Sequence, residues 1–353
     1  MFEGTSGINF VNSLFYRFLQ ILSLLIATIY IIRQKYSTKQ LLLVVGLNVI
    51  GIVCYISSGL SGLFMTLLAI TLLPKNSLDD VLNLLFKEEL IFFSIIVILS
   101  LVGVLNNTPI LIDKGSYIVR AYPFGFGHPN MLAAQGESII FLYLCIHRNN
   151  LKIKHLFMSI IWVIIVYIFA RGRTALYLGI VVVGLITFSK NKMIRKNILR
   201  FLPMTYCIIL IIMILSMLIF RKYGAESPIV KIINDSFFNG RIGLAYRSLM
   251  TYPITLFGHV IDLSIWNKYQ YFVLDNGQVM VLLEYGIIGF ILYFYIFQHI
   301  LDNLKQNDEI ILAIITIAFL IWSMFEGTMY FIGKNFTLLF FINVISNVNY
   351  TNK

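Results

Sequence analysis

The sequence predicts an all-α fold, a bundle of about eleven helices that spans a membrane. Hydrophobic residues make up 59% of the 353 positions and charged residues only 12%, whereas a soluble domain carries about 25% charged residues. The apolar residues come in blocks of about 15–20, the length that crosses a hydrocarbon core about 30 Å thick. Blocks such as IIWVIIVYIFA lack the alternation of a membrane strand, so helices are expected throughout.

The apolar blocks predict the order of elements along the chain. We expect spans near residues 14–32, 41–57, 59–74, 89–106, 130–147, 156–170, 174–189, 202–220, 277–298, 310–326 and 331–348. The charged segment 76–88 has apolar residues at helical spacing and is expected as a separate helix on the inner membrane surface. Without an internal repeat, the chain is expected to form a single membrane domain, 1–353, with an outer loop at 107–129 and a large outer loop at 221–276.

The basic residues predict which loops face the cytoplasm, because cytoplasmic loops carry an excess of Lys and Arg. The set of loops that is richest in them holds Arg33, Lys35, Lys39, Lys75, Lys87, Arg148, Lys152, Lys154, Lys190, Lys192, Arg195, Lys196, Arg200 and Lys305. We therefore expect these loops inside, with the N-terminus outside and the C-terminus inside. The expected location is the plasma membrane of a bacterium.

Composition argues against several other classes of protein. The net charge of +11 is accounted for by basic inner loops, so no nucleic-acid partner is indicated. All three cysteines lie in apolar blocks, which predicts buried free thiols. The histidines are scattered, and neither a nucleotide-binding loop nor a Ser-His-Asp order is present. We expect no metal and no cofactor.

Arginines on the predicted outer face are the most informative polar residues, because positive charge is disfavoured on that side. They are Arg120, Arg171, Arg173, Arg241 and Arg247. A guanidinium group offers a fixed fork of donors that suits phosphate oxygens, so these side chains are candidates for binding an anionic lipid-linked substrate. The alternative is that they reach lipid phosphates without any substrate role.

Two histidines are candidates of lower specificity. His128 precedes Pro129 and Asn130, where Pro suits the first helical turn and Asn can cap it. His128 and Asn130 therefore either contact substrate or form only the start of a helix. His259, in the motif FGHV of the large loop, either acts as a base or is an interfacial residue.

Acidic residues near the outer boundary are candidates for proton transfer. Asp275 and Asn276 stand where the large loop enters the next helix, so they either cap that helix or take part in the site. Glu284 lies one or two turns deeper, where an acid is costly and is either functional or paired with an arginine. Glu326 is a weaker candidate of the same kind, and Glu137 is expected to pair with an arginine.

Together these motifs resemble a known family of membrane enzymes. FGFGHPN, ARGRTAL, NGRI, FGHV and LDNGQVMVLLEYGIIGFIL follow one another between about residues 115 and 297, and in this order they are similar to the motifs of Wzy-type polysaccharide polymerases. These enzymes share a superfamily with the O-antigen ligases. The resemblance implies a metal-independent glycosyltransferase that transfers glycan from undecaprenyl diphosphate to the next lipid-linked unit, in capsule, exopolysaccharide or O-antigen synthesis.

The resemblance also implies roles for particular residues. Arg171 or Arg173, together with Arg241, would bind the diphosphate. Asp275 occupies the slot of the base, although Gly277 and Gln278 depart from the Tyr or Ser that is usual after the DN pair. A chain-length regulator and a flippase would be the expected protein partners, and membrane lipid the surrounding medium.

Two alternative functions remain open at this stage. A ligase would use the same donor and move finished glycan to another acceptor. A transporter or flippase of lipid-linked sugars would be expected to show repeats and interrupted helices. The sequence shows no repeat, and its polar residues concentrate on one face, which favours the polymerase.

Overall fold

A computed structural model describes residues 36–72, 78–113, 118–238, 240–261 and 274–347, with scattered positions between 18 and 33. The chain divides into two compact units. Unit 1 comprises Met1–Lys35 and Lys75–Ile194, and unit 2 comprises Tyr36–Pro74 and Arg195–Lys353. Much of the predicted span 14–32 lies outside the described residues, as do parts of both predicted outer loops.

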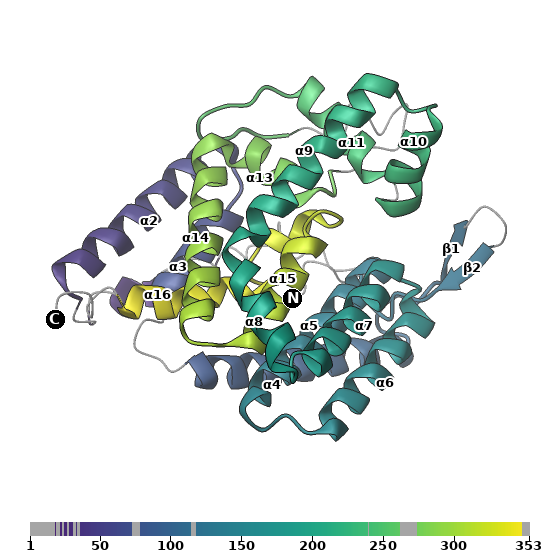
Figure 1. The fold of residues 1–353 in the computed structure, drawn as a ribbon, viewed down its shortest axis with the longest axis horizontal. Helices are drawn as coiled ribbons and strands as arrows, with labels where there is room; N and C mark the ends of the chain where they lie inside the picture. Colours follow the sequence, from purple (N-terminus) through teal and green to yellow (C-terminus); the bar gives the residue numbers. More distant parts are fainter. Residues whose placement is uncertain are drawn as a thin grey trace. The chain divides into compact units, whose positions relative to one another are not determined.

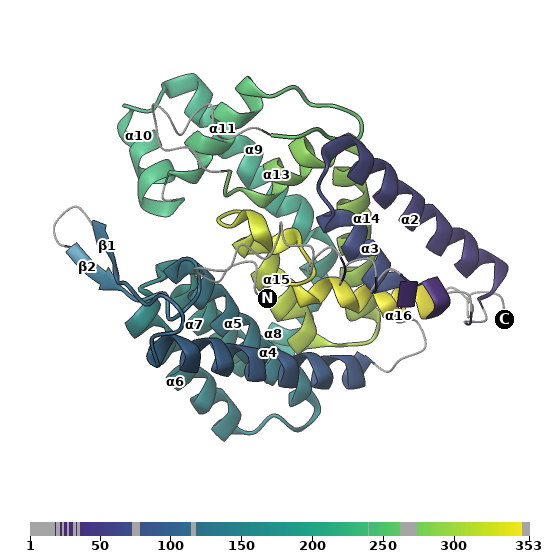
Figure 2. The same cartoon turned by 180° about the vertical axis from the view of Figure 1, so that it is seen from behind.

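Unit 1 is a group of helices around one buried helix. Its elements are α4 Leu78–Leu101, β1 Ile110–Asp113, β2 Ile118–Ala121, α5 Pro129–Ile146, the 3-10 helix η3 Arg148–Asn150, α6 Ile153–Ala170 and α7 Arg173–Phe188. Nearly every residue of α5 is buried, because α4, α6 and α7 all pack against it. Figure 1 shows α5 beside α7 and α6, and Figure 2 shows α4 on the other side. The strands β1 and β2 pair antiparallel, with Leu111 opposite Arg120.

Unit 2 holds the remaining helices. They are α2 Thr38–Ser58, α3 Gly62–Leu72, α8 Lys192–Phe201, η4 Leu202–Met204, α9 Thr205–Tyr223, α10 Pro228–Val230, the π-helix η5 Lys231–Phe237, α11 Arg241–Thr251, α13 Gly277–Glu284, α14 Gly286–Gln306, α15 Ile310–Trp322, η6 Gly327–Tyr330, η7 Phe336–Phe340 and α16 Phe341–Asn347. The boundary between the units falls within α8. The core of unit 2 contains fully buried aromatic side chains of α9, α14 and α15.

The helices support the prediction of a membrane protein, with fewer full-length spans than expected. Among the described residues, four helices are long and apolar enough to cross a membrane: Thr38–Ser58, Ile153–Ala170, Lys192–Tyr223 and Gly286–Gln306. Their outward faces are apolar; on α6 the side chains of Ile161, Ile164 and Ile168 are more than two-fifths exposed. Such faces fit a hydrocarbon surrounding. Cys207 is exposed on α9, whereas Cys54 and Cys145 are buried as predicted.

The prediction that residues 76–88 form a separate surface helix is wrong. Residues 78–88 belong to α4, which continues to Leu101, short of the predicted end at 106. The sequence FKEEL contains no helix breaker, so the helix runs through the charged turns. Residues of unit 1 outside α4 donate to its carboxylates: Gln135 donates to Glu89 at 3.0 Å, and Arg148 pairs with Asp79 at 2.5 Å.

The last two predicted spans are also shorter than expected. The helix predicted at 310–326 ends at Trp322, and the span predicted at 331–348 consists of the 3-10 helix η7 followed by α16. Asn335 explains the irregular start of this region, because its side chain is buried and accepts hydrogen bonds from the amide and the hydroxyl of Thr337.

The predicted span 277–298 is interrupted at Tyr285, between α13 and α14. Gly286 has φ +72°, and a packing loop formed by residues 252–261 lies against the break. Ile287 and Ile288 donate their amides to the carbonyls of Thr255 and Leu256, both at 3.0 Å. An interrupted helix leaves backbone groups without intrahelical partners, and the packing loop supplies these partners.

The packing loop approaches the helix break most closely at Gly258, so we expect a substitution there to destabilise the protein. A Cβ atom on Gly258 would lie 1.9 Å from the Glu284 carbonyl oxygen, and its φ is +83°. We expect Gly258→Ala to lower the free energy of unfolding by roughly 3 kcal/mol or more, measured by thermal unfolding in detergent. Gly46→Ala on α2 is the matched control, since nothing lies within 4 Å of its Cβ position. Equal unfolding temperatures for both variants would contradict this packing.

Candidate functional site

The candidate site in unit 2 lies where three segments meet: the start of α11, the start of α13 and the chain just after α15. The Arg241 guanidinium pairs with the Asp275 carboxylate at 3.2 Å, and its Nε donates to the Phe325 carbonyl oxygen at 2.9 Å. The two charged side chains are 15% and 18% exposed. The pair is therefore largely shielded but accessible, and its geometry is set by a backbone contact as well as by charge.

The turn before α11 positions Arg241. Gly240 has φ +83° and donates its amide to the Asn234 carbonyl oxygen at 2.7 Å, while Asn234 Oδ1 accepts the amide of Gly243 at 2.8 Å. Phe238 stacks on Phe325 with ring centroids 5.3 Å apart. The π-helix η5 thus holds the first turn of α11 against the segment whose carbonyl Arg241 contacts.

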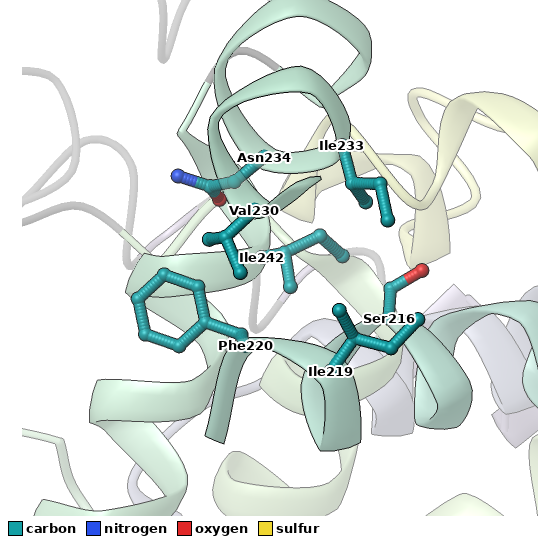
Figure 3. A pocket seen from close by; sticks show the side chains of 7 residues that line it. All are labelled: Ser216, Ile219, Phe220, Val230, Ile233, Asn234 and Ile242. Atoms are coloured by element: carbon teal, nitrogen blue, oxygen red, sulfur yellow. The ribbon is translucent and has the colours of Figure 1, made fainter. Parts of the chain in front are cut away.

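Figure 3 shows the hollow behind this turn, lined mostly by apolar side chains of α9, α10, η5 and α11. It is too tight to admit a water molecule. Its lining includes Phe220, Val230 and Ile242, and Asn234 is the principal polar group. We therefore assign the hollow to the packing of η5 on α9 and not to substrate binding.

Asn276 proves to be structural at this site. Its side-chain oxygen accepts the Val279 amide at 3.0 Å as the N-cap of α13, and its Nδ2 donates to the Met324 carbonyl at 3.2 Å. Asn276 is 1% exposed, so the cap reading of the sequence fits this residue. Next to it, Gln278 donates to Ser323 at 2.7 Å. These bonds fix the start of α13 to the end of α15 and so fix Asp275.

Glu326 is the second carboxyl of the site. Its pKa is raised to about 7, because burial and then the negative charge of Asp275 raise it by more than the positive charges of Arg241 and Lys334 lower it. Glu326 lies four residues beyond the end of α15, outside the apolar helix. Lys334 was not among the sequence candidates, although a cation in the first turn of the predicted span 331–348 was a visible signal. The site thus holds the carboxyl groups of Asp275 and Glu326 under the influence of the positive charges of Arg241 and Lys334.

A second group of candidates gathers at one end of unit 1. The Tyr122 amide, just past β2, donates to the Phe169 carbonyl near the end of α6 at 2.9 Å. A Cβ atom on Gly172 would lie 3.0 Å from that of Ala133 in the first turns of α5. These contacts bring together the segments that carry the remaining predicted residues: Arg120, His128, Asn130, Arg171 and Arg173.

Within this group, Arg171 is the most constrained side chain. It ends α6 in the left-handed conformation with φ +55°, an uncommon conformation for a residue with a side chain. Its Nε is buried and has no hydrogen-bond partner among the described residues, and its guanidinium carbon lies 6.0 Å from the Tyr167 ring centroid. Arg120 and Arg173 are exposed. Arg171 therefore has a shielded donor that an anionic oxygen could satisfy.

The structure assigns the helix cap differently from the sequence. His128 is the N-cap of α5, and its Nδ1 accepts a hydrogen bond from the Asn130 amide at 3.1 Å. Asn130 is therefore the donor to the cap residue and not the cap residue itself. His128 itself is exposed.

The other residues predicted from the sequence lie outside the Arg241 site and outside the group in unit 1, or lack the partner expected for them. His259 belongs to the packing loop, where its amide donates to the Leu283 carbonyl at 3.3 Å, and Glu284 lies at the helix break. Both ring nitrogens of His259 and one oxygen of Glu284 are buried without a hydrogen-bond partner among the described residues. Arg247 is exposed on α11. Glu137 is buried in α5, and the predicted pairing with an arginine is absent for its Oε1 among the described residues.

Comparison with protein-family models, with curated proteins and with solved structures finds no match to this chain.

Proposed function

We propose that the chain is a membrane glycosyltransferase that polymerises lipid-linked oligosaccharide repeat units on the outer face of a bacterial plasma membrane. The donor glycan would be carried by undecaprenyl diphosphate, and the acceptor would be a hydroxyl of the next lipid-linked unit. The observation that carries the proposal is the Arg241–Asp275 pair at the start of two helices. It combines a phosphate-binding cation with a proton acceptor.

The chemistry of the pair fits this transfer. The acceptor oxygen forms a bond to the anomeric carbon, and the bond from that carbon to the diphosphate breaks. The diphosphate leaves with the electron pair, and a neighbouring guanidinium stabilises its developing charge. The hydroxyl proton passes to a carboxylate, for which Asp275 is the proposed acceptor. Both substrates are lipid-anchored, which confines them to one plane and raises their effective concentration.

We propose that the arginines of unit 1 form a second set of hydrogen-bond donors to phosphate oxygens. Arg171 offers a shielded Nε, and Arg173 opens α7 two residues later. The start of α7 also presents backbone amides without intrahelical partners, which favours an anion there. In this proposal Arg173 and Arg171 bind lipid-linked diphosphate, while His128 and Arg120 contact the sugar or the headgroup.

The interrupted helix gives one observation in favour of a transporter of lipid-linked sugars. Discontinuous helices commonly form transporter binding sites, and the break at Tyr285 has buried polar atoms around it. The Arg241–Asp275 pair, by contrast, lies at helix starts and not at mid-helix. We therefore retain the polymerase as the first proposal, with the ligase differing from it only in the acceptor.

The glycan of a deletion strain tests the proposal. We expect loss of long polymer, with a single repeat unit on the lipid carrier or on the final acceptor, when glycan is separated by size and its length determined by mass spectrometry. Accumulation of full-length polymer on the lipid carrier would instead identify a ligase. Accumulation of single units only in the inner leaflet would identify a transporter and refute the proposed polymerase.

A further inference from the structure

The helix α8 carries a concentrated basic surface that the proposed chemistry does not use. Its sequence KMIRKNILRF contains four basic residues and no acidic residue. Lys192, Lys196 and Arg200 are spaced four residues apart and all three are exposed, so they form one row along the helix. Met193 and Phe201 expose 73% and 52% of their surface. The helix thus presents cations and apolar side chains together.

The position of α8 along the chain places it at the edge of the hydrocarbon. The apolar helix that includes α8 and α9 runs over 32 residues, Lys192–Tyr223. At 1.5 Å per residue this length is about 48 Å, whereas a hydrocarbon core is about 30 Å thick. Because α9 alone is apolar enough to fill the core, the basic turns of α8 extend into the headgroup region.

One arginine of α8 already has a protein partner, and this contact holds the helix in place. Arg195 donates to Asp308 Oδ1 at 2.9 Å, to Oδ2 at 2.6 Å and to the Asp308 carbonyl at 2.8 Å. Lys192, Lys196 and Arg200 make no ion pair with the described residues. Like charges four residues apart destabilise a helix, so anions from outside the chain would stabilise this row.

We propose that α8 binds the headgroups of anionic phospholipids through Lys192, Lys196 and Arg200. The phosphate of each headgroup meets the cations, while Met193 and Phe201 insert beside the acyl chains; Arg200 also lies over the Phe201 ring at 5.6 Å. Figure 1 shows α8 at the beginning of α9, and α11 packs at the other end, where Phe220 meets Tyr246. Lipid binding at α8 is therefore separate from the Arg241 site.

Lipid retention tests this surface. The protein is placed in nanodiscs of equal parts phosphatidylglycerol and phosphatidylcholine, re-extracted in mild detergent, and the two lipids retained per protein are quantified by mass spectrometry. We expect enrichment of phosphatidylglycerol for the native chain. In the variant Lys192→Gln/Lys196→Gln/Arg200→Gln the enrichment should fall at least about fivefold, and Lys196→Gln alone should fall in between.

The matched control removes the same charge elsewhere. Lys152→Gln/Lys154→Gln/Lys222→Gln changes three exposed cations outside α8 and should keep the enrichment. Excess inorganic phosphate should leave it unchanged, because free phosphate lacks acyl chains. The proposal would be overturned if the control variant lost as much phosphatidylglycerol enrichment as the α8 variant, or if the α8 variant kept the enrichment. It would also be overturned if the native chain showed no enrichment, or if free phosphate displaced the bound phosphatidylglycerol. Unchanged unfolding temperatures establish that the variants are folded.

Discussion

Arg241→Ala is expected to abolish polymer formation while the protein still inserts into the membrane. Removal of one preorganised donor from a developing charge costs about 10²–10³ in rate, and Arg241 is the donor that this site holds in place through Phe325 and Asp275. The measurement is polymer formation by purified protein from a lipid-linked repeat unit. Membrane insertion and yield are compared with the native chain in the same preparations.

Lysine should not restore activity at this position. An ammonium group is a compact charge and cannot donate to the Phe325 carbonyl and the Asp275 carboxylate with the geometry of the guanidinium fork. Arg221→Ala is the matched control, because it removes an exposed arginine from the end of α9. Full activity in Arg241→Ala, or an equal loss in Arg221→Ala, would reduce Arg241 to a structural residue or a lipid contact.

Several elements were predictable because their limits are encoded locally. Helices expected at 130–147, 156–170 and 174–189 are found at Pro129–Ile146, Ile153–Ala170 and Arg173–Phe188. Pro129 suits a first helical turn, and a short polar turn carrying Gly172 separates the last two helices. Where the limit depends on a distant segment, the prediction failed. The break at Tyr285 depends on the packing loop and the close approach of Gly258, which no local pattern reveals.

The candidate site was predictable in its members other than Lys334, but not in its contacts. Arg241 and Asp275 were both expected at the outer boundary, yet their pairing depends on the Phe325 carbonyl and on the stacking of Phe238. Tertiary contacts of this kind leave no signal in hydropathy. Asn276 illustrates the opposite case, because its expected role as a helix cap has a short-range pattern and is found in the structure, whereas the cap expected at Asn130 is provided by His128.

Replacing each acid of the site by its amide, as Asp275→Asn and Glu326→Gln, distinguishes which of the two accepts the proton. If Asp275 accepts the proton of the acceptor hydroxyl, Asp275→Asn should lower turnover about 100-fold or more, since the amide keeps the size but cannot take a proton. Donor binding should persist, because Arg241 remains. Glu326→Gln should then retain most activity. Turnover and donor affinity are measured separately with purified protein, and Asp275→Glu should restore part of the turnover.

The pH dependence of polymer formation distinguishes Asp275 from Glu326 as the proton acceptor where the activities of the variants at a single pH do not. Burial holds the pKa of Glu326 near 7, and Asp275 contributes to this by repulsion. If Glu326 were the acceptor, activity would rise with pH through about 7, and Asp275→Asn would shift the rise to lower pH because a negative neighbour is lost. If Asp275 is the acceptor, Asp275→Asn loses activity at every pH and shows no such shift. Near-normal polymer formation by Asp275→Asn, with a shifted profile and an inactive Glu326→Gln, would transfer the role of base to Glu326. Of the remaining sequence candidates, His259 and Glu284 belong to the helix break, so their replacement should affect the unfolding temperature together with activity, whereas Asp275→Asn should affect activity alone.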